Sequence, residues 1–130
     1  MKFYIAARFD KKVEVNKLYE LLKNKGHEIT CDWTLHKTIK PYDENQDLAK
    51  NYSIEDILGV KDSDVFILLG DKAGTGMYVE LGAAIFSNII LNRPKIYIIG
   101  EYIARSMFFY HPFVNRRKNV EEVLNELEIN

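Results

Sequence analysis

Paired cysteines and an excess of charge of one sign are both missing from this sequence. Its 130 residues include a single cysteine, Cys31. A lone cysteine excludes an internal disulfide bond and favours a reducing compartment. The chain carries 18 basic and 19 acidic residues, for a formal net charge of -1. This balance provides no basic surface for nucleic acid, so we expect no nucleic acid polymer among its partners.

Long hydrophobic runs are also missing. No stretch approaches the length of a membrane span, and the apolar start at residues 3–7 is too short for a signal sequence. We therefore expect a cytoplasmic protein with no membrane partner. The sequence also shows no internal repeat, low-complexity segment or linker. Because 47% of the residues are hydrophobic, the chain can build one core, and we expect one domain over residues 1–130.

Short apolar runs alternate with helical patterns along the chain. Such alternation predicts an α/β fold with parallel strands joined by right-handed crossovers, a three-layer sandwich of the flavodoxin-like or Rossmann-like kind. Residues 34–50 form a polar connection that is long enough to cover a cleft. Five strands are expected, at residues 2–7, 27–33, 64–69, 95–100 and near 113–114, with helices at residues 13–25, 53–61, 77–91 and 120–127.

The most informative segment is a glycine-punctuated loop at residues 70–76, which follows an apolar strand and leads into a helix that carries Glu80. A ligand site is expected at the carboxyl end of such a strand. The helix start favours the ionised form of Glu80, and an ionised carboxylate can act as a nucleophile. The alternative is a glutamate that only stabilises a helix start. Small residues at 82–84 favour the first interpretation, because they let the helix pack tightly on the sheet. The loop lacks the lysine of a phosphate-binding Walker loop.

Asp56 and Tyr4 are further candidates for the site. Ser53 and Asp56 have the spacing of a helix capping box, which gives Asp56 a structural interpretation. Asp56 also lies beside the apolar residues Ile57 and Leu58, close to the buried side of its helix, which favours a catalytic role. Both interpretations stay open on spacing alone. Tyr4 belongs to the first strand, where its hydroxyl needs a partner such as a carboxylate if it is buried.

A metal site is not expected. His27, Cys31, Asp32 and His36 lie close together in the sequence, but neither their spacing nor a second cysteine supports a closed zinc site. Trp33 has two interpretations, because a single tryptophan either stacks on a flat ring or fills space in the core.

Several of these residues together resemble one enzyme family. The match comprises Tyr4 after the opening strand, Asp56-x-x-Gly59-x-Lys61, Asp64-Val65 and Gly74-Thr75-Gly76-Met77-x-x-Glu80-Leu81-Gly82-x-Ala84. In this pattern the chain resembles the nucleoside 2-deoxyribosyltransferase family, which includes deoxynucleoside monophosphate N-glycosidases. The resemblance covers residues 3–127, and its most specific part is the glycine loop that ends in Glu-Leu-Gly.

The resemblance implies both a reaction and roles for three residues. Glu80 matches the family's nucleophile, Asp56 its partner aspartate, and Tyr4 the tyrosine that orients the nucleophile. The implied reaction cleaves the N-glycosidic bond of a (deoxy)nucleoside or its monophosphate through a glycosyl-Glu80 intermediate, with transfer to another base or to water and without a cofactor. The alternatives are a nucleotide-sensing module that binds without turnover and a structural interaction domain with an apolar patch at residues 108–110.

The expected substrate-binding residues extend beyond this trio. Six residues before the nucleophile, family transferases carry an aspartate and the monophosphate hydrolases tend to carry a serine; this chain has Gly74, which favours neither substrate class. Arg8 is a candidate phosphate ligand. Residues before the last strand reach a neighbouring subunit's site in the family, which implies a homodimer or larger homo-oligomer. The substrate-binding set is Arg8, Phe9, Trp33, Gly74, Gly76, Met77, His111 and Asn115.

Overall fold

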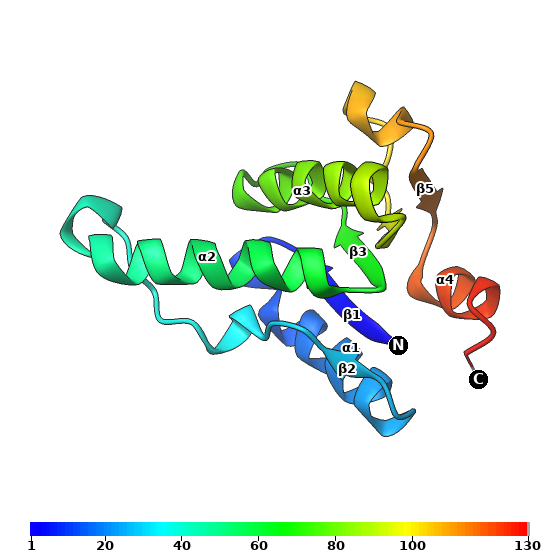
Figure 1. Cartoon of the computed structure of the whole chain (residues 1–130), viewed down its shortest axis with the longest axis horizontal. Helices are drawn as coiled ribbons and strands as arrows, with labels where there is room; N and C mark the ends of the chain where they lie inside the picture. Colours follow the sequence, from blue (N-terminus) through cyan, green and yellow to red (C-terminus); the bar gives the residue numbers. More distant parts are fainter. Residues whose placement is uncertain (130) are drawn as a thin grey trace.

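A five-stranded parallel sheet runs through the structure, a computed structural model that describes residues 1–129 (Figure 1). The strand order is β2-β1-β3-β4-β5, and all neighbouring strands are parallel. This order confirms the expected flavodoxin-like α/β fold. The strands are β1 (Lys2–Ala6), β2 (Glu28–Ile29), β3 (Val65–Leu69), β4 (Lys95–Ile99) and β5 (Val114–Arg117).

Helices cover both faces of the sheet. On one face α2 packs against α3, and on the other α1 and α4 line a common cavity. Right-handed crossovers produce this division. The helices are α1 (Lys12–Asn24), α2 (Gln46–Asp62), α3 (Gly76–Leu91) and α4 (Val120–Glu126), and short 3-10 turns are η1 (Phe9–Lys11), η2 (Trp33–Leu35), η3 (Tyr42–Glu44) and η4 (Met107–Tyr110). Within residues 1–129, no helix combines the length and apolarity that crossing a membrane requires.

The order of the strands reverses between β1 and β3. From β1 the chain moves outward to β2, and it then returns across β1 to form β3 on the other side. These two strands are buried and pair from Phe3↔Val65 to Ala6↔Leu68. Ligands of open α/β sheets bind where the strand order reverses, outside the carboxyl ends of the strands. The glycine loop follows β3 and therefore lies at this position.

Two boundaries differ from the sequence-based prediction. Helix α2 begins at Gln46 instead of Ser53, so Ser53 lies inside the helix, where its hydroxyl donates to the Lys50 carbonyl at 2.8 Å. The capping-box interpretation of Asp56 is therefore wrong. The added turns are mostly polar and extend beyond the sheet (Figure 1), so they carry little apolar periodicity. Strand β2 contains two residues, because only Lys2↔Glu28 and Phe3↔Ile29 pair at this edge.

Candidate active site

A buried hydrogen bond joins β1 to α3 at the centre of the site. Tyr4 is fully buried, and its hydroxyl donates to Oε1 of Glu80 at 2.6 Å. The Tyr4 ring stacks on Phe66 of β3, with the two planes 5° apart and the ring centroids separated by 5.9 Å. Burial and the contact with Phe66 fix the ring, and its hydroxyl in turn fixes one oxygen of the carboxylate.

The structure does not favour the ionised form of Glu80 that the sequence predicts. The pKa of Glu80 is raised to about 8, chiefly by burial; the hydrogen bond from Tyr4 opposes this rise, and the negative charge of Asp56 adds to it. The expectation that the helix start favours the ionised form is wrong, because α3 begins at Gly76 and Glu80 lies just beyond its first turn. The helix dipole acts mainly within the first turn, and here desolvation outweighs it. Such a shift is typical of functional carboxyl groups.

Asp56 reaches the same site because α2 lies unusually close to β1. A Cβ atom on Gly59 would lie 2.7 Å from the Cβ of Cys31 and 3.1 Å from the Tyr4 ring. Only glycine permits this close approach of the helix. Asp56 is half-buried, and its burial raises its pKa. The negative charge of Asp56 thus disfavours the ionisation of Glu80.

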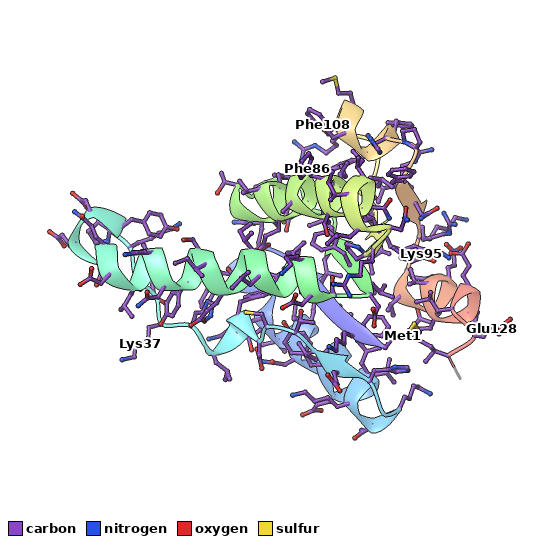
Figure 2. The ribbon with its side chains drawn as sticks, viewed as in Figure 1. Met1, Lys37, Phe86, Lys95, Phe108 and Glu128 are labelled. Carbon is purple, nitrogen blue, oxygen red and sulfur yellow. The ribbon has the colours of Figure 1, made fainter. Side chains whose placement is uncertain are left out.

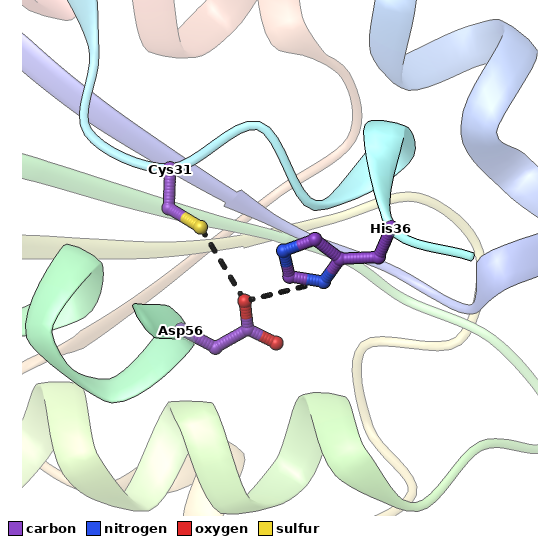
Figure 3. A group of neighbouring side chains, drawn as sticks. All are labelled: Cys31, His36 and Asp56. Carbon is purple, nitrogen blue, oxygen red and sulfur yellow. Dashed lines mark hydrogen bonds and ion pairs between the residues drawn. The ribbon is translucent and has the colours of Figure 1, made fainter. Parts of the chain in front are cut away.

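Cys31 and His36 border Asp56 on its other side (Figure 3). The Cys31 thiol donates to Oδ1 of Asp56 at 3.4 Å, and Nδ1 of His36 lies 3.9 Å from the same oxygen. Sequence analysis missed both residues as members of the site. Their local spacing gave no signal, because they meet Asp56 only through the packing of α2 against the segment after β2.

Arg8 packs on the glycine loop. Its Nη1 lies 3.5 Å from Oδ2 of Asp10 and 3.7 Å from Oδ1 of the buried Asp71, which also accepts a hydrogen bond from the Ala73 amide. A Cβ atom on Gly74 would lie 3.1 Å from Cγ of Arg8 and 2.7 Å from Cε of Met77. The structure therefore brings together three expected substrate-binding residues, Arg8, Gly74 and Met77, beside the carboxyl end of β3.

Replacing Gly74 by aspartate introduces an acid six residues before Glu80, yet we expect it to lower both stability and turnover. Gly74 has φ +109°, a conformation that side-chain-bearing residues rarely adopt. Aspartate in this backbone conformation destabilises the folded protein by about 1–3 kcal/mol. The strained residue lies in the loop beside the site, so we expect turnover to fall as well. We expect thermal unfolding to show a lower melting temperature for Gly74→Asp than for Gly76→Asp, since Gly76 faces open space. Equal melting temperatures would show that the loop does not depend on glycine at position 74.

The two aromatic candidates for binding a base differ in accessibility. Trp33 is buried, and its indole N–H donates to the Ile5 carbonyl at 2.6 Å, so it fills the core. Of the two interpretations of Trp33, its position supports the one in which it fills space in the core, and does not support stacking on a ligand. Phe9 is 41% exposed, and the centroid of its ring lies 6.0 Å from the centroid of the Trp33 ring. Of these two rings, Phe9 is the one with surface available to a ligand.

Asn115 lies away from Glu80 in the chain itself. Asn115 belongs to β5, which β3 and β4 separate from β1, and its amide donates to the Ile96 carbonyl at 3.0 Å. His111 accepts a hydrogen bond from the Phe113 amide. A role of Asn115 in the site of Glu80 therefore requires a second copy of the chain.

Two cavities lie outside the Glu80 site. One of about 430 Å³ lies between α3 and the segment of Arg105 to Phe109, and one of about 510 Å³ lies between α1 and the start of α4. Tyr4, Asp56 and Glu80 line neither of them. The carboxyl groups instead lie on the face of the sheet covered by α2 and α3, where Asp56 and Glu80 both keep part of their surface exposed.

Comparison with known proteins identifies the fold. No protein-family model and no curated protein matches the chain. Among solved structures, the CMP N-glycosidase BcmB of Clostridium botulinum is similar, with a TM-score of 0.62 and 19% sequence identity. The similarity covers 98% of this chain and 99% of that chain. At this identity the similarity shows a common fold over nearly the whole of both chains.

Proposed function

We propose that this chain cleaves the N-glycosidic bond of a (deoxy)nucleoside or nucleoside monophosphate. The hydrogen bond from the buried Tyr4 hydroxyl to Glu80, with Asp56 beside it, is the observation that carries this proposal. An oriented carboxylate next to a second carboxyl group suits the chemistry of a glycosidase. The fold shared with a CMP N-glycosidase and the glycine loop that ends in Glu-Leu-Gly support the same reaction class.

In the first step, an ionised oxygen of Glu80 attacks C1′ of the sugar. A C1′–O bond forms while the C1′–N bond breaks, and the base leaves with the electron pair and takes up a proton from Asp56 or from solvent. Tyr4 holds the carboxylate in position through its hydrogen bond. The raised pKa of Asp56 is compatible with a role in this proton transfer.

In the second step, water or another base attacks C1′ and displaces Glu80 as a carboxylate, and the proton that the attacking group loses passes to Asp56 or to solvent. Two displacements at C1′ give net retention of its configuration. The negative charge of Asp56, when ionised, stabilises the oxocarbenium-like transition state, and its oxygens can hold sugar hydroxyls. None of these steps uses a cofactor.

Product analysis tests this proposal. The protein is incubated with nucleosides and their monophosphates, with and without a second free base, and the products are separated. A 2-fluoro sugar analogue slows the second step, so we expect a sugar adduct on a peptide that contains Glu80. Absence of turnover on every substrate, combined with binding, would favour the alternative of a nucleotide-sensing module, which the absence of an acid at Gly74 supports.

We also propose that the chain forms a homo-oligomer that completes this site. Apolar side chains are exposed along α3 and on η4, and Figure 2 shows Phe86 and Phe108 on these two elements. They are 65% and 57% exposed, respectively. Contiguous apolar surface of this kind is typical of an interface. The partner copy would supply His111 and Asn115, of which Asn115 lies away from Glu80 within one chain.

Arg8 is proposed to recognise a phosphate, and Arg8→Ala tests this. Charge-assisted hydrogen bonds to a phosphate contribute about 1.5–3 kcal/mol. We expect kcat/KM for a monophosphate to fall about 10- to 100-fold while that for the matching nucleoside changes less than about threefold. The control is Arg93→Ala. Arg93 is exposed and precedes β4, so it lies at the amino ends of the strands, opposite the end that carries the glycine loop. An equal loss on both substrates would mean that Arg8 serves only to hold Asp71 and the glycine loop.

A further inference from the structure

Three side chains of different chemistry converge beside α2 (Figure 3). Cys31 comes from the segment after β2, His36 follows η2, and Asp56 belongs to α2. One thiol, one imidazole nitrogen and one carboxylate oxygen from these residues all lie within 4.8 Å of one another. All three residues are only partly buried, so a small ion can reach them from solvent.

The orientation of His36 is fixed from two sides. Its ring stacks on Tyr52 of α2, with a centroid distance of 3.9 Å and an angle of 2° between the planes. Its Nε2 lies 3.1 Å from Oε2 of Glu55. In the neutral imidazole, Nε2–H donates to this carboxylate and Nδ1 keeps its lone pair. Metal-binding histidines typically have such a carboxylate on the nitrogen away from the metal.

The lone pair of Nδ1 faces an oxygen of Asp56 across 3.9 Å, a separation too long for a hydrogen bond. Two groups that attract positive charge thus face each other, and the Cys31 thiol donates to the same Asp56 oxygen. Because the thiol is the donor in this contact, Cys31 carries its proton in the free protein. A divalent cation between the three residues would neutralise the carboxylate and displace the thiol proton.

We propose that Cys31, His36 and Asp56 bind Zn²⁺ as a three-ligand site with a fourth position open to solvent. Thiolate, imidazole and carboxylate are the usual zinc ligands in proteins. In a tetrahedral site with normal bond lengths these donor atoms lie about 3.3–3.6 Å apart, so small side-chain rotations are sufficient. Binding releases the thiol proton to solvent and involves no redox change. The sequence-based rejection concerned a closed site of sequence neighbours, whereas this site takes its third ligand from α2.

Zn²⁺ at this position has a consequence for the proposed reaction. A bound ion occupies Asp56 and prevents it from transferring a proton or holding sugar hydroxyls. Zn²⁺ is therefore expected to inhibit turnover, and a chelator to reverse the inhibition. This consequence rests on the proposed function, whereas the binding of the metal does not.

Metal titration tests the site without any substrate. Protein without a polyhistidine tag is freed of metal by a chelator and titrated with Co²⁺, then with Zn²⁺ as a competitor. We expect one Co²⁺ per chain, with a thiolate-to-cobalt charge-transfer band in the near ultraviolet that Zn²⁺ abolishes. Zn²⁺ is also expected to raise the melting temperature, since it binds only the folded site.

Four variants distinguish this site from adventitious binding. Cys31→Ser should remove the charge-transfer band, and His36→Gln should weaken Zn²⁺ binding more than about 100-fold. Glu55→Gln should weaken it about 10- to 100-fold, because Glu55 only orients His36. The control His111→Gln removes a histidine outside the cluster and should bind as the wild type does.

The proposal is overturned if Co²⁺ gives no charge-transfer band, or if Cys31→Ser binds Zn²⁺ as tightly as the wild type while retaining a cooperative thermal transition. Either result would leave His36 and Asp56 as a simple ion pair of imidazolium and carboxylate. Metal binding without any nucleoside turnover would support the zinc site and count against the proposed function alone. Turnover that Zn²⁺ does not inhibit, in a protein shown to bind Zn²⁺, would separate Asp56 from catalysis.

Discussion

Glu80→Gln is expected to abolish base release while making the protein more stable. Glutamine keeps the size of the side chain but has no carboxylate to attack C1′, so kcat should fall about 10³-fold or more. The stability increases because the wild type must keep a carboxyl group in a site that disfavours its charge. A purely structural glutamate predicts the reverse, since its loss would weaken the helix.

The difference in stability between Glu80→Gln and the wild type depends on pH because the pKa of Glu80 is raised in the folded protein. The pKa of Glu80 is about 8 in the folded protein, above its ordinary value of 4.5. The protonated carboxyl group therefore favours folding below about pH 4.5, and this contribution is lost as the pH rises through about 8. Glutamine does not titrate, so the advantage of Glu80→Gln should grow over this window to the order of 2–4 kcal/mol.

Urea unfolding at pH 5 and at pH 9, combined with turnover assays, measures both effects. The control is Glu20→Gln, which changes an exposed glutamate of α1 on the other face of the sheet. It should leave both the rate and the free energy of unfolding unchanged. Normal turnover in Glu80→Gln would remove the covalent mechanism, and a loss of stability at pH 9 would show that burial does not disfavour the charged form.

The fold could be predicted because its central strands are buried on both faces. Strands β3 and β4 are therefore continuous apolar runs that the sequence displays directly. The start of α2 could not be predicted, because its first turns carry little apolar periodicity and begin after a turn that the Asn45 amide stabilises through the Ile39 and Pro41 carbonyls. Helix boundaries of this kind depend on contacts that local patterns do not record.

Some residues of the candidate site could likewise be predicted from the sequence, and others could not. Tyr4, Asp56 and Glu80 belong to local patterns, and the structure brings them together. The ionisation of Glu80 depends on burial, which a helix position does not reveal, so the sequence predicted the wrong direction. The contact of Cys31 with Asp56 depends on how closely α2 approaches β1 at Gly59. Residues that meet only through such packing are not visible in sequence spacing.

Asp56→Asn is expected to lower kcat about 10²-fold or more. Asparagine keeps the size of the side chain and its ability to accept a hydrogen bond from Cys31, but it lacks the negative charge and the acidic proton that the proposed mechanism assigns to Asp56. With the capping box excluded by the position of Ser53 inside α2, a loss of this size has no helix-capping explanation. The control is Asp47→Asn in the first turn of the same helix, which should leave kcat unchanged.

The same variant should also change the pH profile, which a merely structural role would not do. The charge of Asp56 raises the pKa of Glu80, so removing it should make Glu80 ionise at lower pH. In the wild type, kcat/KM should rise as the pH increases towards about 8, because Glu80 must lose its proton before it attacks. In Asp56→Asn the midpoint of this rise should move to lower pH while the plateau falls. A lower plateau with an unmoved midpoint would mean that the group titrating in the profile is not Glu80.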